Sequence, residues 1–494
     1  MNSSAKAHRS QRAEELRGPW RFQIDPEDLG ERERWFAEDC DRAPWAEVAV
    51  PGAWDLYNLA MWSCEGVGWY ATEIPADLVQ KDKWQRLLFN RVSIHAKVWL
   101  NGQYVGEHLG GYLPFEFDVS AYLHPNRPNS LVLRVDNARR MEWLPAGTKV
   151  EWVQYGGILQ PVHLLTTMPT YISDLRIGAV PAGAGAEVTC TVEVANCSAD
   201  RLDGQVNVNI LGGDSLVTGS TQVGCEPQGK STALVNLHMP QAETWSPESP
   251  VLYEASASLE VAEKTLDQVS DRFGVRTIEV CGPQVLLNGK PLQIKGVNRY
   301  DEYAGFGPTV PEDVVREDLT RIKRCGANLI RVHYPQDPTI LKIMDEIGLM
   351  LMEEVPLNWW GVNWFGVVPN IDDDVVINAA ERALEDMVRR DKNHPCVIVW
   401  SMANECATET ETGIRAMRRL MRRARELDKT RLVTFVADGD VRQDLAFDEA
   451  DLVCLNLYYG VFRPEGKAYH IADMEALVRV PTEEHLRQTR EYFG

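Results

Sequence analysis

The feature that most restricts the fold of this chain is a change of hydrophobic period near residue 281. From there on, short apolar runs alternate with amphipathic segments, and six such runs lie at 292–298, 328–334, 349–355, 397–404, 432–437 and 452–459. Between the first two runs, Val315, Leu319 and Ile322 form one helical stripe that Gly326 closes. Strands that alternate with helices form a parallel sheet, so this region predicts a (β/α) barrel.

The helix after the second run has both of its ends marked in the sequence. Asp337 stands where an N-cap is expected, Pro338 follows in the first turn, and Gly348 ends the segment. The pattern predicts a helix between these residues. The region from 281 to 494 is therefore predicted to be the barrel domain.

Two other regions precede the barrel. Residues 1–168 carry short strand signals broken by turns, including the hairpin signal Asn101-Gly102 between apolar runs. Residues 169–280 alternate apolar and polar side chains, as in EVTCTVEV (187–194), which predicts a small antiparallel β-sandwich. With 494 residues, a division into such separate domains is expected.

The buried run VIVWSMAN (397–404) leads directly into the carboxylate of Glu405. Active sites of (β/α) barrels lie at the carboxyl ends of the strands, so polar residues there point to function. The strand ends carry Asn298, Arg299, Asp301, His333, Tyr334, Glu353, Glu354, Asn404, Glu405, Asp438, Asn456, Tyr458 and Tyr459. Carboxylates, amides and aromatic rings suit a sugar substrate, and two carboxyl groups are what glycoside hydrolysis requires.

Other classes of function find little support in the sequence. The formal net charge of −21 argues against nucleic acid or an anionic membrane as a partner. No phosphate-binding glycine loop and no tight metal-ligand spacing occurs, so neither a cofactor nor a metal ion is expected. The polar N-terminus, the lack of a long apolar stretch and ten scattered cysteines predict a cytoplasmic protein with reduced thiols and no membrane span.

The motifs of the chain resemble those of glycoside hydrolase family 2, which comprises β-galactosidases, β-glucuronidases and β-mannosidases. The barrel segments KGVNRYDEY, NLIRVHYPQD and DKNHPCVIVWSMANE carry the likeness, as do VWLNGQYVGEHLGGYLPFEFDV and DRFGVRTIEV earlier in the chain. The resemblance implies a jelly-roll sugar-binding domain (1–168), an immunoglobulin-like β-sandwich (169–280) and a TIM-type barrel (281–494).

The resemblance also implies roles for single residues. Glu405 matches the acid/base of the family, and Asn404 matches the asparagine that precedes it. The expected substrate-binding residues are Asn404, His333, Glu151, Asn456, Tyr458, Glu354 and Asp301. Glu151 replaces an aspartate that the family usually has at this position. SMANE is closer to the β-glucuronidase branch, so a retaining exo-β-glycosidase of β-glucuronidase type is expected, with β-galactosidase or β-galacturonidase as alternatives.

One departure from the family affects the second carboxylate. The family places its nucleophile after the seventh barrel strand, whereas only six strands are predicted here, so the barrel looks incomplete. Glu483 and Glu491 are weak candidates for that role, and Glu353 or Glu354 is another alternative. An open barrel has unpaired edges, so the expected alternatives are a homo-oligomer, a second chain that completes the barrel, or a truncated product. A non-hydrolytic carbohydrate-binding protein, or a subunit of a split glycosidase, is the alternative of a different class.

Overall fold

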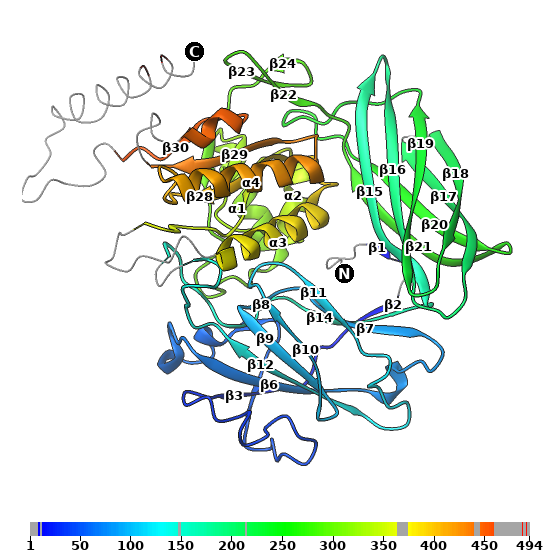
Figure 1. Ribbon diagram of the computed structural model, residues 1–494, viewed down its shortest axis with the longest axis vertical. Helices are drawn as coiled ribbons and strands as arrows, with labels where there is room; N and C mark the ends of the chain where they lie inside the picture. The colour runs from blue at the N-terminus through cyan, green and yellow to red at the C-terminus, as the bar shows by residue number, and fades with distance from the viewer. Residues whose placement is uncertain are drawn as a thin grey trace, which may run out of the picture.

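The computed structural model describes residues 8–9, 12–146, 150–212, 215–362, 374–438, 445–458, 487 and 491. Its elements form three groups that follow one another along the chain (Figure 1). Two groups consist of antiparallel sheets, and the third is a parallel sheet covered by helices. This agrees with the predicted succession of two β-sandwiches and a barrel. Among the described residues, no helix is both long and apolar enough to cross a lipid bilayer.

The first group is a β-sandwich. Its strands are β2 (Arg12–Glu15), β3 (Trp20–Ile24), β4 (Ala46–Val48), β5 (Gly52–Ala53), β6 (Val67–Ile74), β7 (Trp84–Phe89), β8 (Val92–Ser93), β9 (His95–Leu100), β10 (Gln103–Leu109), β11 (Phe115–Asp118), β12 (Asn129–Asp136), β13 (Gly157–Ile158) and β14 (Val162–Thr167). They form a six-stranded sheet, a four-stranded sheet and a short three-stranded one. The hairpin between β9 and β10 turns at Asn101 and Gly102, whose φ angles are +52° and +73°, as the predicted two-residue turn requires.

The second group is a smaller β-sandwich. Its strands are β15 (Thr170–Ala182), β16 (Gly185–Asn196), β17 (Leu202–Gly212), β18 (Ser215–Cys225), β19 (Gly229–Met239), β20 (Tyr253–Val261) and β21 (Lys264–Phe273). Val188, Cys190, Val192 and Val194 are at most 1% exposed, because alternate residues of β16 face the core. One further strand of this sandwich precedes the first group in the sequence: β1 (His8–Arg9) pairs with β21.

The third group begins with a small antiparallel sheet of β22 (Ile278–Cys281), β23 (Gln284–Leu287) and β24 (Lys290–Pro291). Six parallel strands follow in the order of the sequence: β25 (Gly296–Asn298), β26 (Leu329–Arg331), β27 (Met350–Glu354), β28 (Val397–Asn404), β29 (Leu432–Ala437) and β30 (Cys454–Leu455). The helices are α1 (Glu312–Arg324), α2 (Pro338–Ile347), α3 (Asp374–Asp391) and α4 (Glu411–Leu427). Every predicted apolar run contains one of these strands.

The helix ends also follow the sequence signals. The Asp337 side chain accepts a hydrogen bond from the Thr339 amide at 2.6 Å, and Gly348 ends α2 with a φ of +71°. The apolar stripe of α4 is buried, which leaves its arginines on the outer surface.

The parallel sheet is open within the described residues. No described strand pairs with the outer edge of β25 or of β30. On β25 the side chain of Val297 is 41% exposed, and the neighbouring Ile294 is 39% exposed. A curved parallel sheet with two unpaired edges is an incomplete barrel. The candidate site lies at its carboxyl edge, where His333 contacts Glu151 and Trp152, which precede β13 of the first sandwich.

Candidate active site

Strand β28 carries Asn404 and Glu405 to the carboxyl edge of the sheet. All eight residues of β28 are buried, and Glu405 follows with a φ of +48°, in the left-handed region that non-glycine residues rarely adopt. The Glu405 amide still donates to the Val436 carbonyl at 2.8 Å. This backbone conformation turns the chain at the strand end, and such strained residues cluster at functional sites.

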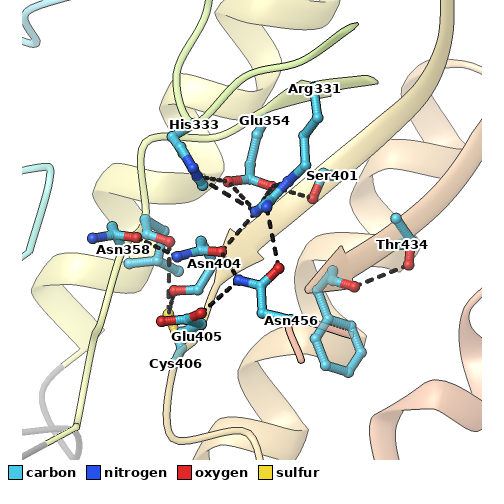
Figure 2. Close-up of polar contacts among 12 residues, drawn as sticks. Arg331, His333, Glu354, Asn358, Ser401, Asn404, Glu405, Cys406, Thr434 and Asn456 are labelled. Carbon is cyan, nitrogen blue, oxygen red and sulfur yellow. Dashed lines mark hydrogen bonds and ion pairs between the residues drawn. The ribbon is translucent and has the colours of Figure 1, made fainter. Parts of the chain in front are cut away.

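The carboxylate of Glu405 is held by three neutral donors, one of which, Asn456, is labelled in Figure 2. Trp359 Nε1 donates to Oε2 at 2.8 Å, Asn456 Nδ2 donates to Oε1 at 2.5 Å, and the Tyr458 hydroxyl also donates to Oε1. Glu405 is only 1% exposed. The donors come from two separate segments, the loop after β27 and the stretch after β30, so the position of the carboxylate depends on the assembled fold.

The amide of Asn404 is fixed on both sides. Its Oδ1 accepts from Arg331 Nη2 at 2.7 Å and from Asn456 Nδ2 at 3.0 Å, while its Nδ2 donates to Asn358 Oδ1 at 2.7 Å. Asn456 therefore contacts Asn404 and Glu405 with one nitrogen. The predicted neighbours Asn404, Glu405, Asn456 and Tyr458 are brought together at one place.

Glu354 is the buried anion behind this group. Arg331 forms an ion pair with it at 2.9 Å, His333 Nδ1 lies 3.1 Å from Oε1, and the Ser401 hydroxyl donates to Oε2 at 2.8 Å. Complete burial raises the pKa of this carboxyl, but Arg331, His333 and Ser401 outweigh burial and lower it below its ordinary value. Both oxygens of Glu354 are thus bound by protein groups.

The first sandwich supplies one wall of the site. His333 lies against the rings of Trp152 and Tyr300, at centroid distances of 5.9 Å and 5.4 Å. Glu151 Oε2 lies 3.9 Å from His333 Nε2. Burial raises the pKa of Glu151, His333 lowers it, and the charge of Glu405 raises it further, which reflects two acids that face the same space.

Asp301 lies beside this wall rather than free in the site. The Tyr334 hydroxyl donates to its Oδ1 at 2.7 Å, and Arg91 of the first sandwich forms an ion pair with its Oδ2. A solvent-open hollow of about 510 Å³ continues past Glu151 and Tyr300 toward the exposed edge of β25.

The candidates for a second carboxylate differ in position. Glu353 is buried on the far side of β27, where its Oε1 accepts from the Gln336 amide at 3.1 Å and lies 3.6 Å from Arg390. Glu491 is exposed and pairs with Arg487 one helical turn away. Glu483 and Tyr459 lie outside the described residues. Burial raises the pKa of Asp438, and the charge of Glu405 raises it further.

Sequence reasoning missed two residues that the structure places in the site, and it did not predict the contact that Trp359 makes there. Arg331 connects Glu354 to Asn404, Asn358 receives the Asn404 amide, and Trp359 donates to Glu405. A charged residue inside the apolar run NLIRVHY was the available signal for Arg331. Nothing in the sequence distinguished the contact of Trp359 from ordinary loop packing.

Relatives of this chain are glycosidases. It is 29% identical to a β-galactosidase of Thermoanaerobacter pseudethanolicus over 92% of the chain and 60% of that protein. It is also 29% identical to human β-glucuronidase, over 92% of the chain and 73% of that protein. The chain therefore spans less than two thirds of the first of these relatives.

Solved structures of glycosidases are also similar to this chain. A β-galacturonidase from Eisenbergiella tayi bound to galacturonate superimposes with a TM-score of 0.82 at 28% identity, over all of this chain and 80% of that one. A Bacteroides uniformis β-glucuronidase, covalently bound to cyclophellitol-6-carboxylate aziridine, gives 0.81 at 26% identity over 91% of this chain and 56% of that one.

Three models of one family match successive parts of the chain. The sugar-binding domain of the glycosyl hydrolases family 2 matches residues 13–168, the model named for the family itself matches 170–276, and the family's TIM barrel domain matches 278–487. These matches, together with the parallel sheet and its buried Asn-Glu pair, show that the chain belongs to glycosyl hydrolase family 2.

Proposed function

We propose that this chain is a retaining exo-β-glycosidase of β-glucuronidase type, in which Glu405 is the general acid/base. The observation that carries the proposal is the placement of Glu405 at the carboxyl end of β28, beside Asn404 and held by Trp359 and Asn456. Such a carboxyl group can donate a proton to the leaving oxygen and later remove one from water.

The other residues of the site suit a bound sugar ring. Glu151 and His333 form a polar wall that can exchange hydrogen bonds with hydroxyl groups, while Trp152 and Tyr300 hold the imidazole in place. Asn404, fixed by Arg331, keeps the strand end rigid next to the acid. In this proposal Asn456 and Tyr458 orient the Glu405 carboxyl, and Glu354 neutralises Arg331.

Retention of configuration requires a second carboxylate about 5 Å from the acid/base. Among the described residues, Glu353 and Glu354 are already bound to other groups, so neither is our candidate for the nucleophile. A terminal β-glucuronide is the proposed substrate, supported by the likeness to proteins named β-glucuronidases. A β-galactoside and a β-galacturonide are the alternatives, since relatives bear those names too.

The test is hydrolysis of p-nitrophenyl β-glucuronide, β-galactoside, β-galacturonide, β-mannoside and β-glucoside by the purified chain. Glu405→Gln keeps the shape of the side chain and removes its proton chemistry. Its matched control is Glu411→Gln, because Glu411 has a side chain 90% exposed at the start of α4. We expect one substrate to be cleaved, activity to fall about 100-fold or more in Glu405→Gln, and the control to match the wild type.

A folded chain that cleaves none of these substrates would contradict the proposal. Calorimetric titration with glucuronate and galacturonate would then separate the remaining possibilities. Binding without turnover would favour a carbohydrate-binding protein or one subunit of a split glycosidase. Glu353 and Glu354 support this alternative, because both carboxylates are already bound by other protein groups.

We also propose that the open edges of β25 and β30 are covered by another copy of this chain or by a second polypeptide, because exposed strand edges invite pairing. Light scattering during gel filtration tests this proposal, and a monodisperse monomer would contradict it. A cytoplasmic location is proposed as well, on the basis of buried unpaired thiols such as Cys396 and Cys406.

A further inference from the structure

Three consecutive side chains after β25 reach across to the first sandwich. Tyr300 lies near Trp152, with ring centroids 6.0 Å apart. Asp301 pairs with Arg91, and Glu302 contacts the segment that follows Glu151. This short stretch is therefore one of the places where the barrel contacts the sandwich, and it lies next to the wall of the site.

The pair of Arg91 and Asp301 is the buried part of this contact. The two side chains are 9% and 7% exposed, and Arg91 also donates from Nε to the Gly111 carbonyl at 3.0 Å. Tyr334 donates to the same carboxylate at 2.7 Å. An ion pair shielded from water is geometrically demanding, so it fixes how the two domains meet.

Glu302 holds the backbone of the sandwich segment directly. Its Oε1 accepts from the Val153 amide at 3.2 Å, and its Oε2 lies 3.5 Å from the Tyr155 hydroxyl. Val153 is two residues beyond Glu151. The contact therefore sets the path of the chain next to the acid that faces Glu405.

Among the described residues, Glu151 has little else to keep it in place. Its contact with His333, at 3.9 Å, is longer than a hydrogen bond. The next residue, Trp152, is better anchored, since its Nε1 donates to the Tyr112 hydroxyl at 3.0 Å. The orientation of Glu151 thus depends on how its backbone is held rather than on its own carboxylate.

We propose that Asp301 and Glu302 are positioning residues, which clamp residues 151–155 so that Glu151 stays against His333 in the sugar site. Arg91 completes the clamp from the sandwich side. This changes the role predicted for Asp301, from a substrate ligand to a group that acts through Arg91. The proposal rests on the proposed function only for its effect on substrate, since the clamp itself is a feature of the fold.

Activity tests the clamp through a double-mutant cycle. Glu302→Ala should raise the KM for the preferred p-nitrophenyl glycoside about 10-fold and change kcat less than about 3-fold. In a Glu151→Ala background the same change should alter KM less than about 2-fold, because the residue it positions is gone. If Glu302→Ala raises KM as much in the Glu151→Ala background as in the wild type, the proposal is overturned.

Hydrogen exchange tests the clamp without any activity. Among the described residues, no hydrogen bond or ion pair joins Arg91 to residues 151–155, yet Arg91→Met should speed exchange of the backbone amides in a peptide covering 150–158. Arg91→Lys should restore most of the protection. The matched control is Arg134→Met, which removes an ion pair to Asp28 within the same sandwich and away from the barrel.

Equal exchange in Arg91→Met and wild type would overturn the clamp. If no glycoside is cleaved while exchange in Arg91→Met speeds up as expected, the clamp stands and the proposed function fails. If glycosides are cleaved but the cycle is additive, the function stands and the clamp fails.

Discussion

The Nη2 atom of Arg331 lies 2.7 Å from Oδ1 of Asn404 and 2.9 Å from Oε2 of Glu354. One guanidinium at the end of β26 thereby connects the ends of β27 and β28. Asn404 directly precedes Glu405. The hydrogen bond from Arg331 to Asn404 therefore also holds the chain next to the proposed acid/base. Loss of either charge leaves the other one buried and unpaired.

Arg331→Met is therefore expected to destabilise the protein by about 3–5 kcal/mol, because it leaves the Glu354 carboxylate buried without its cation. Adding Glu354→Gln should recover part of this loss, since no charge then remains to be desolvated. Urea unfolding of the wild type, both single variants and the double variant measures the coupling. Additive losses would show that the two side chains do not act as a pair.

Trp359→Phe tests the donor on Oε2 of Glu405, which is 2.8 Å away. The change keeps an aromatic ring and removes only the N–H group. Without this donor the carboxyl group is held less firmly, so kcat/KM for the preferred p-nitrophenyl glycoside should fall about 10-fold. An unchanged kcat/KM would mean that Trp359 only packs there.

The stability of the barrel should carry a pH signature from Glu353. Burial raises the pKa of Glu353 well above its ordinary value of 4.5, and the charge of Asp391 raises it further, while Arg390 opposes both. Between the ordinary and the raised pKa, the folded state holds more protons than the unfolded state, so this group lowers stability as pH rises above 4.5.

Glu353→Gln removes that dependence. As the pH rises from 5 to 8, the Tm of the variant should therefore rise relative to the Tm of the wild type by about 2 °C or more. Calorimetry at several pH values measures the difference, with Glu411→Gln on the exposed start of α4 as the control. A constant difference across this range would mean that Glu353 already titrates near its ordinary value.

Local signals account for the parts of the fold that the sequence predicted well. The turn at Asn101 and Gly102, and the capping of α2 by Asp337, each depend on a few neighbouring residues. Hydrophobic period likewise reveals a strand or a helix over one segment. These signals were sufficient for the six parallel strands and for the placement of Glu405 at a strand end.

Contacts between distant segments account for what could not be predicted. The partner of Asp301 is Arg91, 210 positions earlier in the chain, and no periodicity relates the two. Trp359 reaches Glu405 only because the loop after β27 passes the end of β28. Such contacts follow from tertiary packing within and between domains, which a single sequence does not display.

The cysteines provide a last prediction, which tests the expected reduced state. Cys281 and Cys325 are the exposed cysteines, whereas Cys396 and Cys406 are buried, and burial raises the pKa of both buried thiols. A disulfide reagent reacts with accessible thiolates. We therefore expect a fast phase of two thiols in the native protein, lost in the Cys281→Ser/Cys325→Ser variant, and all ten thiols after unfolding in urea without reductant. Fewer than ten would contradict the reduced state and the proposed cytoplasmic location.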